Sequence, residues 1–224
     1  MSSRHDLVFL FDVDNTLFDN DRLQNDLFRQ LAREFGTRAR SRYVSIFEEL
    51  RSELGYADYL GALERYRLEK LHDPRVLRMA NWLVDYPFTN RLYPGALDVI
   101  RRLKRWGRVA ILSDGDAVFQ PRKVESSGLW KALDGHVLIF IHKEKELACV
   151  ERLYPAEHYV IVDDKLRILE AIKDKWKDRV TTVFPRQGHY AKDKKALAEY
   201  RPADISIRHI ADLLKFERDV FLAA

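Results

Sequence analysis

The feature that most constrains the fold is a set of short apolar runs in which hydrophobic residues follow one another without alternation. Such a run suits a strand that is buried on both faces, as in a parallel sheet covered by helices. Four runs have this character: Leu7 to Phe11, Val109 to Leu112, Val137 to Ile141 and Tyr159 to Val162. Two further segments, Arg179 to Pro185 and Ile205 to Ile207, predict a fifth strand and a short edge strand.

Helical patterns separate these runs. In PGALDVIRRLKRWG, apolar residues from Ala96 to Trp106 fall on one stripe, with Pro94 at the start and Gly107 as a stop. The alternation of strand and helix predicts an α/β fold built on a doubly wound, mostly parallel, Rossmann-like sheet.

The spacing of the runs predicts an insertion. From Ser113 to His142 is 29 residues, and the next two intervals, to Asp163 and to Pro185, are 21 and 22, each enough for one crossover helix. From Asp12 to Ser113 is 101 residues, far more than one crossover needs. We therefore expect a core domain of residues 1–18 and 87–224, with residues 19–86 forming a second domain.

The inserted segment reads as helical throughout. Leucines and phenylalanines recur at helical spacing up to Gly36 and again up to Gly55, Leu60, Leu63 and Leu71 mark a third helix, and Asp73 with Pro74 opens a fourth. An all-helical cap that emerges directly after the first strand is well placed to act as a lid. We expect Trp82 and Tyr86 in its core.

Polar side chains follow four of the predicted strands. They are Asp12, Asp14 and Thr16 after the first, Ser113, Asp114 and Gly115 after the second, Lys143 after the third, and Asp163 and Asp164 after the fourth. Ligands bind at the carboxyl ends of the strands in open parallel sheets, so these side chains are expected to form one site.

The residue types at this edge suggest phosphoryl transfer through an aspartyl phosphate. Asp163 and Asp164, with one carboxylate of the first pair, offer the oxygen ligands that Mg²⁺ prefers. A lysine would add positive charge, and the Ser113 hydroxyl and the Gly115 amide could hold phosphate oxygens. One acid of the first pair would attack phosphorus, and the other would handle protons.

These motifs resemble those of the haloacid dehalogenase-like hydrolase superfamily. FDVDNTLF fits its first motif, ILSDG its second, a lysine after the third strand its third, and VDD its fourth, in the same order. The resemblance implies that Asp12 is the nucleophile and Asp14 the general acid/base, with its backbone carbonyl touching Mg²⁺. It also implies that Thr16 supports the loop and Ser113 binds phosphate. Asp163 and Asp164 would hold the metal.

The chain departs from the family pattern at three points. Asp114 stands where Asn is common, and Ile168 where a later acid sometimes occurs. No Lys-Pro pair marks the third motif, so we choose Lys143, with Lys145 as the alternative. Lys123 is expected at the surface of its helix.

Several further polar residues have competing interpretations. Arg186 and His189 could line the rim of the site or belong to an ordinary turn around Gly188. His142 is more readily explained by a structural hydrogen bond than by substrate contact. Cys149 is expected to be a buried small hydrophobe, and because it is the only cysteine an internal disulfide is excluded.

Charge and composition narrow the partners. The 39 basic and 35 acidic residues are interspersed, so the net charge of +4 gives little reason to expect nucleic-acid binding. No segment predicts a signal peptide or a membrane span, and we expect a cytoplasmic protein. The oligomeric state is open.

The predicted function is a Mg²⁺-dependent phosphatase that acts on a small phosphorylated metabolite. Three alternatives stay open: a phosphomutase, a 2-haloacid dehalogenase on the same scaffold, and a binding module that keeps the fold without the chemistry. The second acid, Asp14, and the pair Asp163 and Asp164 count against a dehalogenase, which needs neither a metal nor a second acid.

Overall fold

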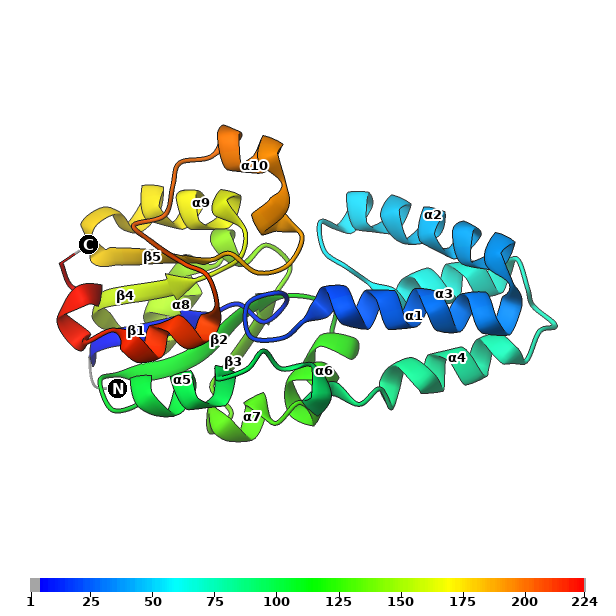
Figure 1. Ribbon diagram of the computed structural model, residues 1–224, viewed down its shortest axis with the longest axis horizontal. Helices are drawn as coiled ribbons and strands as arrows, with labels where there is room; N and C mark the ends of the chain where they lie inside the picture. Colours follow the sequence, from blue (N-terminus) through cyan, green and yellow to red (C-terminus); the bar gives the residue numbers. More distant parts are fainter. Residues whose placement is uncertain (1–4, 224) are drawn as a thin grey trace.

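A six-stranded parallel sheet forms the centre of the protein in the computed structural model, which describes residues 5–223 (Figure 1). Its spatial order is β3-β2-β1-β4-β5-β6, and every neighbouring pair is parallel. The strands are β1 His5–Phe11, β2 Arg108–Asp114, β3 Val137–Phe140, β4 Ala156–Val162, β5 Val180–Pro185 and β6 Ile205–Ile207. The predicted α/β class and the edge position of the sixth strand are confirmed.

The two faces of the sheet explain the unbroken apolar runs. Leu7, Phe9 and Phe11 of β1 belong to one buried cluster, whereas Val8 and Leu10 belong to a second cluster on the opposite face. Successive side chains in a strand point to opposite faces, so a strand covered on both sides is apolar at every position.

Helices cover both faces. Side chains of α5 and α7 pack with the first cluster, and those of α8 and α9 pack with the second. The helices are α1 Asn20–Phe35, α2 Thr37–Leu54, α3 Tyr59–Leu68, α4 Arg75–Val84, α5 Ala96–Leu103, α6 Phe119–Ser126, α7 Leu129–Ala132, α8 Leu147–Leu153, α9 Leu166–Trp176 and α10 Lys194–Glu199. Helix α5 is shorter than its sequence pattern, since it ends at Leu103 and Trp106 follows it.

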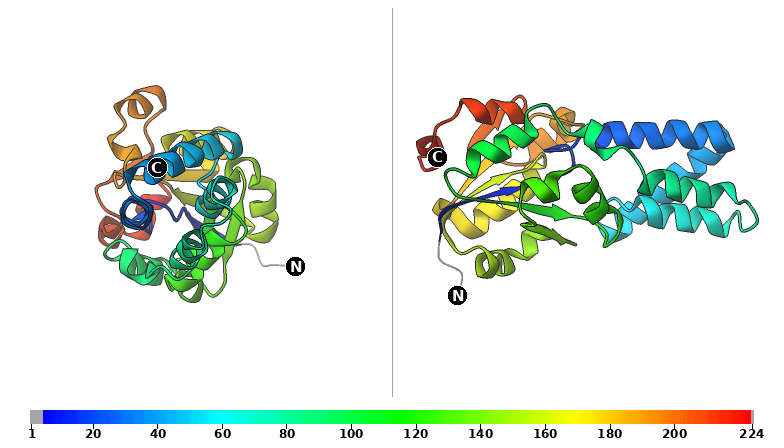
Figure 2. Two further views of the ribbon diagram at one scale, coloured as in Figure 1. Left: turned by 90° about the vertical axis from the view of Figure 1, so that its right-hand side faces the viewer. Right: turned by 90° about the horizontal axis from the view of Figure 1, so that it is seen from below.

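Helices α1 to α4 form a separate bundle, here called the helical lobe, beyond the carboxyl ends of the strands (Figures 1 and 2). Asp19 caps α1 by accepting a hydrogen bond from the Arg22 amide, and Asp58 caps α3 through the Gly61 amide. Gly55 ends α2 in the left-handed conformation, with φ of +80°.

Three details differ from the sequence expectations. Helix α3 ends at Leu68, and Leu71 lies beyond it with 65% of its surface exposed, so Leu71 is not part of the helix. Strand β3 ends at Phe140, and Ile141 is 59% exposed. Cys149 is partly exposed rather than buried.

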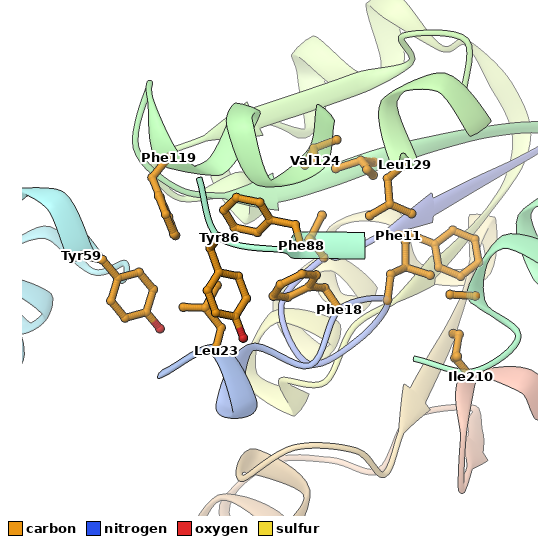
Figure 3. Close-up of a cluster of buried hydrophobic side chains, with 14 of the residues drawn as sticks. Phe11, Phe18, Leu23, Tyr59, Tyr86, Phe88, Phe119, Val124, Leu129 and Ile210 are labelled. Carbon is orange, nitrogen blue, oxygen red and sulfur yellow. The ribbon is translucent and has the colours of Figure 1, made fainter. Parts of the chain in front are cut away.

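A chain of aromatic rings connects the lobe to the sheet (Figure 3). Phe88 contacts both Phe18 and Phe119, and Phe119 contacts Tyr59 at the start of α3, with ring centroids 5.6 to 6.1 Å apart. Tyr86 joins this chain through Phe88, so it is buried as predicted, at the base of the lobe. The apolar core is thus continuous from sheet to lobe.

Among the helices of residues 5–223, none combines the length with the apolar composition that crossing a membrane requires.

Candidate active site

The predicted site residues meet where the strand order reverses. Strands β1 and β4 lie side by side, yet their crossovers run to opposite sides of the sheet. Asp12 follows β1, whereas Asp163 and Asp164 follow β4, so all three lie at this switch point. Such a position is the usual ligand site of an open α/β sheet.

Asp12, Asp163 and Asp164 form a buried acid triad. Each offers a carboxylate oxygen within 4.8 Å of the others, and their exposed fractions are 3%, 0% and 1%. Burial raises the pKa of Asp163 to about 6, although Lys143 opposes the shift, and burial raises the pKa of Asp164 well above its usual range.

Lys143 neutralises part of this charge. Its Nζ lies 2.5 Å from Asp12 Oδ1 and 2.6 Å from Asp163 Oδ2, and its side chain is fully buried. Burial opposes its charge, but the carboxylates of Asp12 and Asp163 outweigh this effect and hold the pKa of Lys143 above its ordinary value. Lys145 is exposed, so Lys143 is the lysine that reaches the carboxylates.

The triad fits a divalent cation. Asp12 Oδ2 and both carboxylate oxygens of Asp164 are buried without a hydrogen-bond partner among the described residues. Leaving ionised oxygens buried and unpaired is costly, and a hard cation with oxygen ligands removes that cost. The carboxylate of Asp14 lies outside the triad, so its predicted metal contact through the backbone stays a prediction.

Asp114 supports the loop that carries Lys143. Its Oδ1 accepts the N–H groups of His142 at 3.2 Å and Lys143 at 2.7 Å, and His142 has a φ of +121° that non-glycine residues rarely adopt. The Gly115 amide, which we predicted to hold a phosphate oxygen, donates to the Phe140 carbonyl at 3.0 Å, and its contact with a phosphate stays a prediction. Contact between Asp114 and a substrate stays a prediction.

Ser113 lies beside Asp12, and Thr16 lies in the loop after β1. The Ser113 hydroxyl lies 3.5 Å from Asp12 Oδ1 and accepts a 3.0 Å hydrogen bond from Gln120 Nε2. Thr16 is fully buried, and its hydroxyl has no hydrogen-bond partner among the described residues. The structure brings Ser113 to Asp12 and adds Gln120 as a polar contact, while phosphate contact by Ser113 or Thr16 stays a prediction.

Lys123 is the residue whose predicted position differs most from the structure. It is 1% exposed, its Nζ lies 2.5 Å from Asp14 Oδ1 and 3.2 Å from Asn20 Oδ1, and it packs between the rings of Phe18 and Phe119. The predicted surface position is wrong. Its place four residues after Phe119 was a usable signal, because that spacing puts both on one face of α6.

The segment that follows β5 holds the loop after β1 in place. Gln187 Nε2 donates to the carbonyls of Asn15 at 3.3 Å and Thr16 at 3.0 Å. A Cβ on Gly188 would lie 2.6 Å from Asn15 Cβ, which explains the glycine. His189 pairs with Asp21 at 2.6 Å and lines the cavity described next, whereas Arg186 is exposed.

Two cavities lie against this edge. One of about 70 Å³ lies between the lobe and Asp14, and one of about 400 Å³ reaches Asp164 from the side of α9 and α10. A larger hollow of about 680 Å³ on the outer side of α1 has no member of the acid triad in its lining. Of the three, only the cavity of about 400 Å³ is lined by a triad member, Asp164, and the cavity of about 70 Å³ is lined by the predicted site residues Asp14 and Asp114.

Comparisons with known proteins agree with this geometry. The model of the haloacid dehalogenase-like hydrolase family matches residues 7–174. A solved structure from Burkholderia xenovorans LB400, described as a haloacid dehalogenase-like hydrolase, is 57% identical, with a TM-score of 0.92 over 96% of this chain and 98% of that one. No curated protein matches the chain.

Two more distant structures share the fold. The HAD-hydrolase YfnB from Bacillus subtilis, bound to magnesium, is 16% identical, with a TM-score of 0.65 over 95% of this chain and 98% of that one. The L-2-haloacid dehalogenase from Xanthobacter autotrophicus, with chloropropionic acid covalently bound, is 19% identical, with a TM-score of 0.61 over 93% of this chain and 96% of that one.

Proposed function

Since the chain belongs to the haloacid dehalogenase-like hydrolases, we propose that it is a Mg²⁺-dependent phosphatase acting on a small phosphate monoester. The observation that carries this choice is the pair of Asp164 oxygens, buried beside Asp12 without a partner among the described residues. A metal-dependent reaction gives them a purpose, whereas a dehalogenase needs no cation there. Asp14, held by Lys123, is a second feature that phosphoryl transfer uses.

Asp12, Asp163 and Asp164 would hold the Mg²⁺. When bound, the ion supplies positive charge that offsets the repulsion between a carboxylate nucleophile and a phosphate dianion. Lys143 contributes charge to the same end from its contact with Asp12.

The residues divide the reaction into two displacements. A carboxylate oxygen of Asp12 forms a bond to phosphorus while the bond to the leaving oxygen breaks, and Asp14 gives that oxygen a proton. Water then attacks the phosphorus of the aspartyl phosphate while Asp14 takes a proton from that water. The bond between phosphorus and the Asp12 oxygen breaks, which restores the Asp12 carboxylate and releases inorganic phosphate. The Ser113 hydroxyl is placed to hold a non-reacting phosphate oxygen, 3.5 Å from Asp12.

The helical lobe would act as a cap. We propose that residues 19–86 form this cap and that residues 1–18 and 87–224 form the core. The small cavity between lobe and core favours a small metabolite over a macromolecular substrate. We place the protein in the cytoplasm and expect neither a nucleic-acid nor a membrane partner.

The discriminating experiment is hydrolysis of an aryl phosphate. The purified protein should release phosphate with Mg²⁺ and lose this activity with a chelator or with the Asp12→Asn substitution. Asp98→Asn is the matched control, because Asp98 is 57% exposed and pairs with Arg101 on the surface of α5. Halide release from an L-2-haloacid without Mg²⁺, with no phosphate release, would replace the phosphatase by the dehalogenase.

A phosphomutase and a binding module would each give a different result in this assay. A phosphomutase would return the phosphoryl group to a sugar or alcohol in preference to water. A binding module would show neither activity yet would still bind a phosphorylated ligand.

A further inference from the structure

The two cavities beside the acid triad share one wall. Arg51, Gly55, Lys165 and Tyr190 line both the cavity over Asp14 and the larger cavity that reaches Asp164. Arg51 and Gly55 come from the end of α2 in the lobe, whereas Lys165 and Tyr190 come from the core. A ligand on this wall would therefore contact both parts of the protein at once.

The lobe is fixed against the core at this wall. A Cβ on Gly55 would lie 2.6 Å from the Cε1 atom of His142, so the end of α2 approaches the core more closely than another residue would allow. Arg51, four residues earlier, hydrogen-bonds the hydroxyl of Tyr190 across the gap. The position of Arg51 is thus set by contacts on both sides.

Most other charges around the cavities already have partners. Asp14 pairs with Lys123, His189 with Asp21, and Arg167 with Glu144. Asp114 accepts two backbone N–H groups, and Asp193 accepts two at the start of α10. These groups have little charge left to offer a ligand.

Arg51 and Lys165 differ from them. Within residues 5–223, Lys165 forms no ion pair closer than 4.0 Å. Burial opposes its charge, but the buried carboxylates of Asp164 and Asp12 hold the pKa of Lys165 above its ordinary value. The acidic contact of Arg51 is Glu48 at 3.5 Å, a side chain 54% exposed, and pairs of this kind contribute little. Both cations instead lie over the ring of Tyr190, with centroid distances of 5.9 Å for Arg51 Cζ and 5.3 Å for Lys165 Nζ.

Two cations on one aromatic ring, neither of which forms a close ion pair with a buried carboxylate in residues 5–223, can bind an anion together. The ring gives each cation a modest attraction and holds it in place, while the two charges repel each other. An oxyanion between them would relieve that repulsion, and an arginine can bind a carboxylate or a phosphate through two parallel hydrogen bonds.

We propose that the substrate carries a second oxyanion, besides the phosphoryl group that is transferred, and that Arg51 and Lys165 bind it beside Tyr190. This inference rests on the proposed phosphatase function. The substrate class is a small phosphate monoester whose leaving group bears a carboxylate or another phosphate. The adjoining cavity of about 400 Å³ has the size that small-molecule sites commonly have, about 300–1,000 Å³.

Matched substrate pairs test the proposal. One pair is 2-phosphoglycolate and 2-hydroxyethyl phosphate, which differ by one carboxylate, and another is fructose 1,6-bisphosphate and fructose 6-phosphate. In each variant the readout is the ratio of kcat/KM for the member with the second anion to that for its partner. The wild-type ratio should exceed about tenfold for at least one pair, since one charge-assisted contact contributes about 1.5–3 kcal/mol. The substrate pair that shows this ratio tells whether the second oxyanion of the substrate is a carboxylate or a phosphate.

The Arg51→Gln and Lys165→Met substitutions should each bring that ratio close to one, and Arg51→Lys should restore part of it. Arg65→Gln is the control, because Arg65 pairs with Glu53 on the outer side of the lobe and should leave the ratio unchanged. Equal losses for both members of a pair would overturn the proposal, since they would assign Arg51 to the transferred phosphoryl group or to the fold.

A binding measurement separates this inference from the phosphatase proposal. If no phosphate ester is hydrolysed, the phosphatase proposal fails, but calorimetric titration with the same pairs still tests the anion site. Tighter binding of 2-phosphoglycolate than of 2-hydroxyethyl phosphate, lost in Arg51→Gln, would support it. Equal affinities for both members of both pairs would overturn it.

Discussion

Two buried lysines hold the two acids of the first motif, and they do so in different surroundings. Lys143 is fully buried and bridges Asp12 and Asp163 at the carboxyl edge of the sheet. Lys123 is 1% exposed and bridges Asp14 and Asn20 where the sheet meets the lobe. The first lysine belongs to the charge balance of the acid triad, and the second links an acid to the entrance of the lobe.

The difference predicts how each lysine responds to removal. Asp12 and Asp163 are enclosed with Lys143, so they would be left as neighbouring charges without solvent. Asp14 is 22% exposed and can turn to water, and Asn20 also has Tyr59 as a partner at 3.0 Å. Lys143 should therefore matter more for both stability and activity.

The largest effect is expected for Lys143→Met. It breaks a buried ion pair on one side, which costs about 3–5 kcal/mol in the free energy of unfolding. Turnover of an aryl phosphate with Mg²⁺ should fall by about 10²–10³, as when a charged donor to the reacting group is lost. Denaturant unfolding and steady-state kinetics measure both. Lys143→Arg keeps the positive charge at this position. A Lys143→Met variant that folds as wild type and retains full activity would contradict the role given to Lys143.

Lys123→Met should have a smaller effect. Methionine fills similar space between the aromatic rings, and water can reach Asp14, so we expect a loss of about 1–3 kcal/mol in stability. The value of kcat should fall by about 10–10² with little change in KM, because Asp14 loses the contact that orients it for proton transfer. Recovery of kcat in Lys123→Arg would confirm an orienting role. A change in KM alone would assign Lys123 to substrate binding instead.

A substitution in the acid triad should raise the free energy of unfolding, whereas the two lysine substitutions should lower it. Asp164→Asn replaces a buried carboxylate that has no hydrogen-bond partner in residues 5–223, so the metal-free protein should gain about 1–3 kcal/mol in unfolding free energy. The same substitution should abolish the rise in Tm that Mg²⁺ produces in the wild type. Thermal unfolding with and without Mg²⁺ checks both, and a destabilised metal-free variant would argue against an unpartnered carboxylate.

The pH dependence of the metal-free protein follows from the same burial. The folded pKa of Asp163 is about 6, above the unfolded value of about 3.9, so the folded state binds the proton more tightly. The raised pKa of Asp163 makes the metal-free protein more stable as the pH falls from about 6 to about 4, and less stable as the pH rises over the same range. Because Mg²⁺ needs the ionised form, its stabilising effect should be larger at about pH 7.5 than at about pH 5. An equal effect at both would contradict the prediction.

The smallest effect is expected for Asp114→Asn. An amide oxygen can accept the same N–H groups of His142 and Lys143, so stability should change by less than about 1 kcal/mol. Activity should stay within about threefold of wild type. Asp114→Ala removes the acceptor and should cost more in both respects, and equal effects of the two substitutions would exclude this hydrogen-bonding role.

The two lysines also show how far the sequence could lead. Asp12, Lys143 and Asp163 each follow a buried apolar run, and strand ends of a parallel sheet meet at one edge, so local patterns were enough to bring them together. Lys123 follows no strand, and its partners Asp14 and Asn20 precede it by more than 100 residues. Its burial depends on how the lobe packs, which no local pattern encodes.

The same limit applies to the cavity wall. Arg51 lies on a helix whose sequence pattern shows only an apolar stripe. Tyr190 lies in the segment after Gly188, which the sequence allowed to be either a site rim or an ordinary turn. Their contact depends on how the end of α2 packs against the core, where Gly55 lies close to the ring of His142. The Gly115 amide is a related case, since its hydrogen bond to Phe140 depends on how β2 and β3 pair, which the sequence of the loop alone does not tell.

The most direct test is chemical capture of the phosphorylated residue. Enzyme quenched with acid during turnover of a phosphate ester with Mg²⁺, then reduced with borohydride, should carry homoserine in place of Asp12, as peptide mass spectrometry would show. Turnover with Asp12 unmodified, or with the modification on another side chain, would contradict the proposal that this carboxylate attacks phosphorus.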